Sequence, residues 1–229
     1  MLEEESTRFS RDNTTMRKCL QFFTLACGLI VTEASAPRAA AESVEMPSVK
    51  LRIDDYAAVA TDLLARAQDG VTQLYEAIGV NTQWLKTRHL SSWPSAASFP
   101  ADSGVADLTV VVLDPTMTTR IAPSPNAMGL AANAPSAQGR IVYVFYDRLR
   151  IVTRQRDVPG AAALSLVMAH EIGHLLLPYG SHTEAGVMRG HWDLEGFRHL
   201  DIGRLKFTPL QGQQIRRMLR GLRPFGPSQ

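Results

Sequence analysis

The spacing of hydrophobic positions predicts helices and strands from about residue 54 onward. Apolar residues recur every three or four positions up to Ile78, which indicates an amphipathic helix on a sheet, capped by Asp54 or Asp55 and ended by Gly79. Residues 161–177 are apolar on almost every side, which predicts a central, buried helix. Runs rich in β-branched residues predict strands at 80–85, 108–113 and 140–146.

The remaining segments predict loops, an edge strand and a last helix. Residues 91–106 and 114–127 are rich in proline and small residues and are expected to be loops, and 181–206 is irregular by pattern. Residues 129–132 are expected to form a short edge strand, and 208–219 an amphipathic helix. This order predicts an α+β fold: a small, mixed, twisted sheet with the amphipathic helix, the central buried helix, and the C-terminal helix packed behind.

Composition and charge exclude several classes of protein. The chain has 229 residues, of which 45% are hydrophobic and 20% charged, and these values exclude collagen-like, mucin-like and mostly disordered chains. The net charge is +2 without a long basic run, so no nucleic-acid partner is expected. No apolar run reaches the roughly 18 residues that span a bilayer. We expect a monomer without a membrane span in the mature chain.

The N-terminal segment resembles a secretory signal peptide behind an extension. After a polar, acidic opening, Met16 is followed by basic Arg17 and Lys18 and by the mostly apolar run 19–31. Small residues then continue to Ala41, where cleavage is expected. We therefore expect translation to start at Met16 and the mature protein to be secreted or periplasmic. The alternative is a membrane anchor, for which the apolar run is short.

The leader determines the expected domain boundary and the expected cysteine content of the mature chain. Residues 1–41 are expected to be the extension and signal peptide, and 42–229 a single domain without internal repeats. Both cysteines, Cys19 and Cys27, lie in the leader. A disulfide and a cysteine-ligated metal are therefore not expected in the mature chain.

The segment His170-Glu171-Ile172-Gly173-His174 near the end of the buried helix has the spacing of a zinc site. Histidines four apart on a helix project from one face, so both imidazoles can bind one Zn²⁺. Glu171 lies next to the first ligand and can act as the general base. The structural alternative is a pair of buried histidines without metal, which costs several kcal/mol if they are unpaired.

Four residues compete for the third ligand position. His182 lies eight residues beyond His174, after a turn at Pro178-Tyr179-Gly180 that can bring the chain back to the ion. The competitors are Glu195, which would suit a two-histidine, one-glutamate site, and His191 and Asp193. We favour His182, because histidine is a common zinc ligand and the turn residues explain the return of the chain.

The segment HEIGHLLLPYGSH, followed by Ala185-Gly186-Val187-Met188, resembles the metzincin clan of zinc metallopeptidases. The resemblance implies His170, His174 and His182 as ligands, Glu171 as general base, and Met188 as the methionine of the turn beneath the metal. Where the clan has a glycine and the third histidine, this chain has Leu177 and Gly180. His182 follows two residues later, with Pro178 and Gly180 in place of the helix-ending glycine.

These residues predict a secreted, zinc-dependent endopeptidase in which Glu171 assists the attack of zinc-bound water on a peptide bond. An extended peptide or protein substrate is expected to add to the edge strand, with Gly129 and Leu130 as candidate contacts. The alternatives are an inactive, secreted zinc-binding protein, a structural domain without metal, and a gluzincin-type peptidase with Glu195 as the third ligand.

Overall fold

The computed structural model describes residues 45–91, 107–122, 124–134, 139–190 and 204–221. Internal contacts divide the chain into two units, Met1–Ser43 and Val44–Gln229, and every described residue belongs to the second. The expected leader lies outside the described residues. The start at Met16, the signal peptide and the domain boundary after residue 41 therefore stay predictions.

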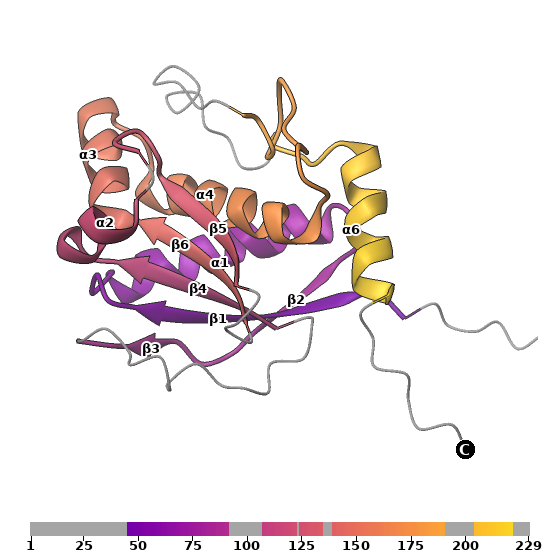
Figure 1. The fold of residues 1–229 in the computed structure, drawn as a ribbon, viewed down its shortest axis with the longest axis horizontal. Helices are drawn as coiled ribbons and strands as arrows, with labels where there is room; N and C mark the ends of the chain where they lie inside the picture. Colours follow the sequence, from indigo (N-terminus) through magenta and orange to yellow (C-terminus); the bar gives the residue numbers. More distant parts are fainter. Residues whose placement is uncertain (1–44, 92–106, 123, 135–138, 191–203, 222–229) are drawn as a thin grey trace, which may run out of the picture. The chain divides into compact units, whose positions relative to one another are not determined.

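The described residues form one mixed sheet in the order β2-β1-β4-β6-β5, with β3 also pairing β1 (Figure 1). Neighbouring strands are parallel except β5, which runs antiparallel to β6 at one edge. The strands are β1 (Ser48–Asp55), β2 (Asn81–Trp84), β3 (Arg88–His89), β4 (Asp107–Leu113), β5 (Gly129–Ala134) and β6 (Gly139–Phe145). The expected α+β class, with a mixed sheet and an edge strand that begins at Gly129, is confirmed.

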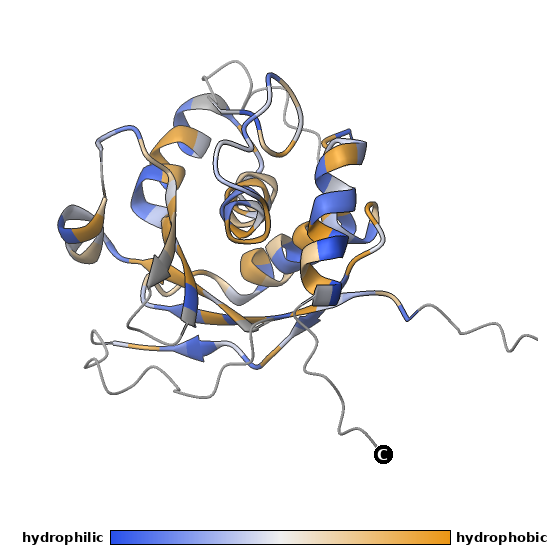
Figure 2. Ribbon diagram, turned by 45° about the vertical axis from the view of Figure 1, so that its right-hand side comes forward, coloured by the Kyte–Doolittle hydropathy of each residue, from blue (hydrophilic) through white to orange (hydrophobic). Residues whose placement is uncertain are grey.

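Helices α1 and α4 contact each other and lie on the same face of this sheet (Figure 1). The described helices are α1 (Thr61–Glu76), α2 (Pro115–Ile121), α3 (Tyr146–Arg156), α4 (Gly160–Leu176) and α6 (Pro209–Gly221). Figure 2 shows hydrophobic residues around most of α4, whereas α6 carries both hydrophobic and hydrophilic residues. None of the described helices is long and apolar enough to cross a membrane.

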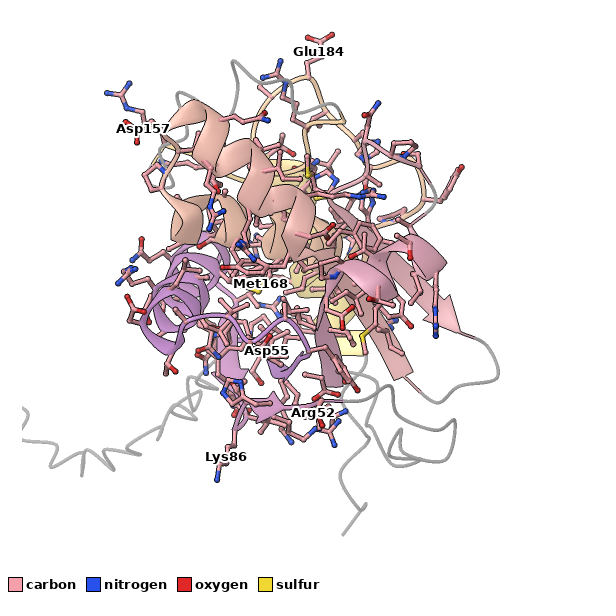
Figure 3. All side chains as sticks on the ribbon, turned by 90° about the vertical axis from the view of Figure 1, so that its left-hand side faces the viewer. Arg52, Asp55, Lys86, Asp157, Met168 and Glu184 are labelled. Carbon is pink, nitrogen blue, oxygen red and sulfur yellow. The ribbon has the colours of Figure 1, made fainter. Side chains whose placement is uncertain are left out.

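The main core lies between the sheet and the helices α1 and α4. Val49, Leu51 and Ile53 alternate along β1 and are fully buried, and residues 163–169 of α4 are all buried. Met168 lies in this interior (Figure 3). A second apolar cluster includes Val111 and Phe145 of the sheet and Met117 of α2. Because the central strands pack on both faces, β4 and β6 are continuous apolar runs rather than alternating ones.

The N-terminal strand corrects one prediction: α1 begins at Thr61, not at Asp54 or Asp55. Both carboxylates belong to the end of β1 and are buried. Asp55 accepts hydrogen bonds from the backbone N–H groups of Ala57 and Val59, both at 3.0 Å, and contacts the His89 ring. Asp54 pairs with Arg88 in β3. Asp55 therefore organises the turn from β1 to α1, and Asp54 connects β1 to β3, so neither caps a helix.

The segment 114–127, expected to be a loop, contains the short helix α2. Asp114 caps it by accepting a hydrogen bond from Met117 N–H at 2.7 Å, and Pro115 occupies the first turn, where its missing N–H costs little. The helix α3, which follows β6 directly, was also not predicted. Its mean hydropathy is low and its apolar positions are few, so its sequence carries little periodic signal.

Candidate metal centre

Three histidine rings converge at the end of α4. The helix supplies His170 and His174, and the loop that follows it supplies His182. His174 Nε2 lies 3.0 Å from His170 Nε2 and 3.0 Å from His182 Nε2. One ring nitrogen from each histidine lies within 4.8 Å of the others, so the group could hold a metal ion. A tetrahedral site with Zn–N bonds of about 2.0–2.1 Å has ligand atoms roughly 3.3 Å apart, close to these separations.

The protonation state of the first histidine favours metal binding. His170 Nδ1 lies 2.8 Å from the carbonyl oxygen of Val187, which can only accept, so Nδ1 carries the hydrogen. The lone pair of Nε2 is then left facing the other two rings. Several lone pairs that point at one centre repel each other unless a cation lies between them, and neutral imidazole nitrogen is a ligand that Zn²⁺ prefers. The donor set therefore fits zinc.

Burial keeps these rings in the metal-binding form. Desolvation is the largest cause that lowers the pKa of His170, and the hydrogen bond to Val187 partly opposes it. Desolvation, followed by repulsion from His170 and His182, lowers the pKa of His174 to about 4. Both rings are therefore neutral at physiological pH, as metal ligation requires.

Gly173 and Met188 connect α4, which carries two of the candidate ligands, to the turn beyond it. Met188 is fully buried, and a Cβ atom on Gly173 would lie well inside van der Waals contact of its sulfur. The same Cβ would lie 3.3 Å from the ring of Phe207. The missing side chain between His170 and His174 thus lets the methionine and the aromatic ring pack directly on α4.

A tight turn holds the segment that contains Met188. Thr183 N–H donates to the Met188 carbonyl at 2.8 Å, and Gly190 N–H donates to the Thr183 carbonyl at 3.2 Å. Gly186 has a φ of +84°, and a side chain there would collide with the carbonyl of Lys206. Val187 N–H donates to that same carbonyl at 3.1 Å. Val187, whose carbonyl orients His170, is therefore itself held in place by the hydrogen bond of its own N–H group.

Glu171 lies against the edge strand β5. Burial raises the pKa of its carboxyl group from 4.5 to about 7, and the backbone of Ala131 partly opposes this shift. A Cβ atom on Gly129 would lie 2.7 Å from Glu171 Cγ and 2.9 Å from Oε1. The carboxylate thus occupies the space that a side chain on Gly129 would need. A carboxyl group with this pKa can both take and return a proton near neutral pH.

The two predicted substrate contacts face different ways. Gly129 faces Glu171, whereas Leu130 packs against the second apolar cluster. The Met128 carbonyl accepts from Phe145 N–H at 2.9 Å, and by the alternation of an antiparallel pair the backbone of Leu130 also bonds to β6. The backbone groups of Gly129 then point to the open edge of the sheet.

The other ligand candidates, Glu195, His191 and Asp193, lie outside the described residues. Sequence reasoning missed Val187, because a backbone carbonyl leaves no signature in the side-chain pattern. It also missed Gln211, a buried polar residue of α6. The available signal was the spacing Thr208-x-x-Gln211 at the start of that helix, which is typical of a capping box.

Comparison with known proteins finds a structural similarity at low sequence identity. The chain is similar to the crystal structure of archaemetzincin from Methanopyrus kandleri, with 15% identity and a TM-score of 0.49. The match covers 76% of this chain and 97% of that chain. No protein-family model matches the sequence, and no curated protein matches it.

Proposed function

We propose that this protein is a zinc-dependent peptidase that hydrolyses peptide bonds at the His170, His174 and His182 centre. One observation carries the proposal: three imidazole nitrogens converge on one point, and Glu171, the half-buried residue next to the first of these histidines, has a pKa near neutrality. Three nitrogen ligands leave a fourth position open, which is the arrangement of a catalytic rather than a structural zinc site.

The chain's own residues account for the proton transfers. When bound, Zn²⁺ would polarise a peptide carbonyl and make a water molecule more acidic. Glu171 accepts the proton of the attacking water and delivers it to the leaving amine. The Ala131 backbone favours the ionised form of this carboxyl group, and the Val187 carbonyl keeps the His170 ring in one tautomer.

The open edge of β5 is the proposed place for the substrate. An extended peptide can add to a sheet edge through backbone hydrogen bonds. No strand of the described residues pairs with β5 at this edge, where the backbone of Gly129 lies next to the Glu171 carboxylate. A peptide bound there would have its backbone beside the proposed general base, and Gly129 adds no side chain that would hinder its approach.

We also propose that the enzyme acts outside the cytoplasm. The proposal is supported by the sequence of the leader, residues 1–41, with its basic start, apolar run and small residues. N-terminal sequencing of the protein recovered outside the cytoplasm should begin at Glu42. A mature protein that keeps the apolar run 19–31 would contradict cleavage.

The decisive experiment compares zinc content and peptide hydrolysis in wild type, Glu171→Ala and His182→Ala. Wild type should bind one zinc ion per chain and cleave members of a peptide library. Because Glu171 is not a ligand, its alanine variant should keep zinc and lose activity by about 10²–10⁴-fold. His182→Ala should lose both, because two imidazoles hold zinc far more weakly than three.

Three other outcomes would replace the proposal. A wild type that keeps zinc without cleaving any peptide, and that Glu171→Ala leaves unchanged, would be an inactive zinc-binding protein. Loss of zinc in Glu195→Ala but not in His182→Ala would establish a gluzincin-type site. A wild type purified without added zinc that contains no metal and takes none up would be a structural domain.

A further inference from the structure

The loop that carries His182 leaves the protein interior before it returns to the centre. Pro178, Tyr179 and Gly180 are exposed, and the Tyr179 side chain has no burial at all. His182 itself is exposed, and Glu184 extends outward from the tip of the loop (Figure 3). An exposed loop has many accessible conformations, so holding its histidine at the centre requires specific anchors.

The first anchor lies on the C-terminal side of His182. Thr183 exchanges backbone hydrogen bonds with Met188 and Gly190, and the Gly190 backbone packs on the ring, since a Cβ atom there would lie 3.3 Å from His182 Cβ and Nδ1. This anchor is internal to the loop. It fixes the shape of the turn but does not fix where the N-terminal side of the loop lies relative to α4.

The second anchor comes from α6, thirty residues further along the chain. Gln211 Nε2 donates to the backbone carbonyl of Ser181, the residue before His182, at 3.0 Å. The loop and the first turn of α6 lie side by side (Figure 1). Gln211 is buried, with 4% of its surface exposed, so this hydrogen bond is largely shielded from water.

The other half of the same amide caps α6. Gln211 Oε1 accepts from Thr208 N–H at 2.9 Å, and Gln211 N–H donates to Thr208 Oγ1 at 3.2 Å, which is a reciprocal capping box. The cap requires the amide oxygen to face Thr208, and the NH₂ group is therefore turned toward Ser181. A single side chain thus starts the helix and holds the loop.

We propose that Gln211 is a positioning residue for the metal centre: its amide ties the backbone beside His182 to the first turn of α6 and thereby sets the third ligand. This inference rests on the proposed zinc centre and extends it to a residue that touches neither metal nor substrate. In this chain the third histidine follows a three-residue exposed turn that does not restrict the conformation of the loop. A hydrogen bond from outside the loop therefore provides this restriction. Groups that orient a metal ligand typically change metal affinity by about 10–100-fold when removed.

Three variants separate the anchor from the helix cap. Gln211→Glu keeps an acceptor for Thr208 N–H, and glutamate is a normal capping-box residue, but it cannot donate to the Ser181 carbonyl. Gln211→Met is similar in size and loses both interactions without adding a charge. Thr208→Ala weakens the cap and leaves the amide free to hold Ser181, so it is the matched control.

The measurement is the affinity of the full chain for Zn²⁺, by competition with a chromophoric chelator, together with the urea stability of each metal-free protein. Gln211→Glu and Gln211→Met should bind Zn²⁺ about tenfold or more weakly than wild type. Thr208→Ala should stay within about twofold in affinity while it loses stability to urea, because it removes a helix cap but not the anchor. Metal-free Gln211→Glu should also lose some stability, because it removes a buried hydrogen bond and places a carboxylate beside the Ser181 carbonyl, so Zn²⁺ affinity is the deciding measurement.

Two results would overturn the inference while leaving the zinc centre intact. One is wild-type Zn²⁺ affinity in both Gln211 variants. The other is a loss of affinity in Thr208→Ala as large as that in Gln211→Met, which would assign the effect to the helix start rather than to the bond with Ser181. Absence of Zn²⁺ binding in wild type would instead contradict the proposed function, so the two failures are distinguishable.

Discussion

At the scale of single residues, the absence of a side chain at Gly129 is as important as the presence of one at Glu171. The carboxylate lies against the backbone of β5, in the volume that a Cβ atom on Gly129 would fill. Glycine normally weakens a strand, because it has more freedom to lose on folding. Its position here is explained by the close approach of the proposed general base.

Gly129→Ala should therefore displace the Glu171 carboxylate and reduce kcat without removing zinc. The new Cβ would lie 2.7–3.0 Å from three side-chain atoms of Glu171, so the carboxylate must move. A misplacement of about 1 Å can cost on the order of a hundredfold in rate. Steady-state kinetics and zinc analysis of the same preparation provide the test.

The matched control for this variant is Ala132→Ser, which changes the same strand on its opposite face and should leave kcat within about twofold. The metal-free stability of both variants should be measured in parallel, since alanine by itself suits a strand better than glycine. A Gly129→Ala enzyme with wild-type kcat would show that the carboxylate position in this structure is not the catalytic one.

At the scale of elements, the sequence predicts those whose pattern is strongly periodic or strongly apolar. The buried helix expected at 161–177 is α4, Gly160–Leu176, because its apolar surface on all sides has no other stable environment. The strand β1 was missed although Val49, Leu51 and Ile53 alternate with polar residues. The two adjacent aspartates resemble a helix cap, and only the sheet shows that they are buried at a strand end.

The sequence likewise predicts the part of the candidate site that lies on one helix, but not the contacts that depend on tertiary structure. The spacing of His170, Glu171 and His174 on one helix is local, so the sequence contains it. His182 was one of four candidates, because only tertiary structure shows that its ring reaches the centre. The second bond of Gln211 was beyond sequence reasoning, since the capping-box pattern gives no information on what else the amide contacts.

The packing of α4 on the turn around Met188 leads to a prediction about Gly173. In an exposed helix, Gly→Ala gains about 1 kcal/mol. At Gly173 the added methyl group would overlap the buried sulfur of Met188 and lie 3.3 Å from Phe207, so the net result should be a loss of about 1–3 kcal/mol. Urea unfolding of the metal-free protein measures this difference.

Gly221→Ala is the control for this substitution, because nothing lies within 4 Å of a Cβ atom there and the change should be neutral or slightly stabilising. If the overlap with Met188 is the cause, Gly173→Ala should cost less in a Met188→Ala background, and a double-mutant cycle measures that coupling. A Gly173→Ala protein as stable as wild type would show that the turn can move away from α4 at no cost.

At the scale of the whole described unit, the centre joins segments that are far apart in sequence. Two of the candidate ligands come from α4, and the third comes from a loop whose Ser181 carbonyl accepts a hydrogen bond from Gln211 of α6. The proposed base belongs to α4 but takes its position from β5. Without metal, only hydrogen bonds and packing connect the exposed His182 loop to the helix, so ligation should stabilise the folded protein as well as create the site.

Zinc should therefore raise the unfolding temperature, and the rise should depend on the third histidine. A ligand that binds only the folded state adds about 2.7 kcal/mol at a free concentration 100 times its Kd. For a unit of this size that corresponds to a Tm increase of about 5–10 °C. Thermal unfolding with EDTA, and then with zinc restored, should show this shift in wild type. In His182→Ala most of the shift should be lost.

The control is the unfolding temperature of the two proteins without metal. These temperatures should agree within about 2 °C, because His182 is exposed and its bond to the metal is absent from both proteins. Equal zinc shifts in the two proteins would mean that the ring at 182 does not bind the metal and that another residue completes the centre.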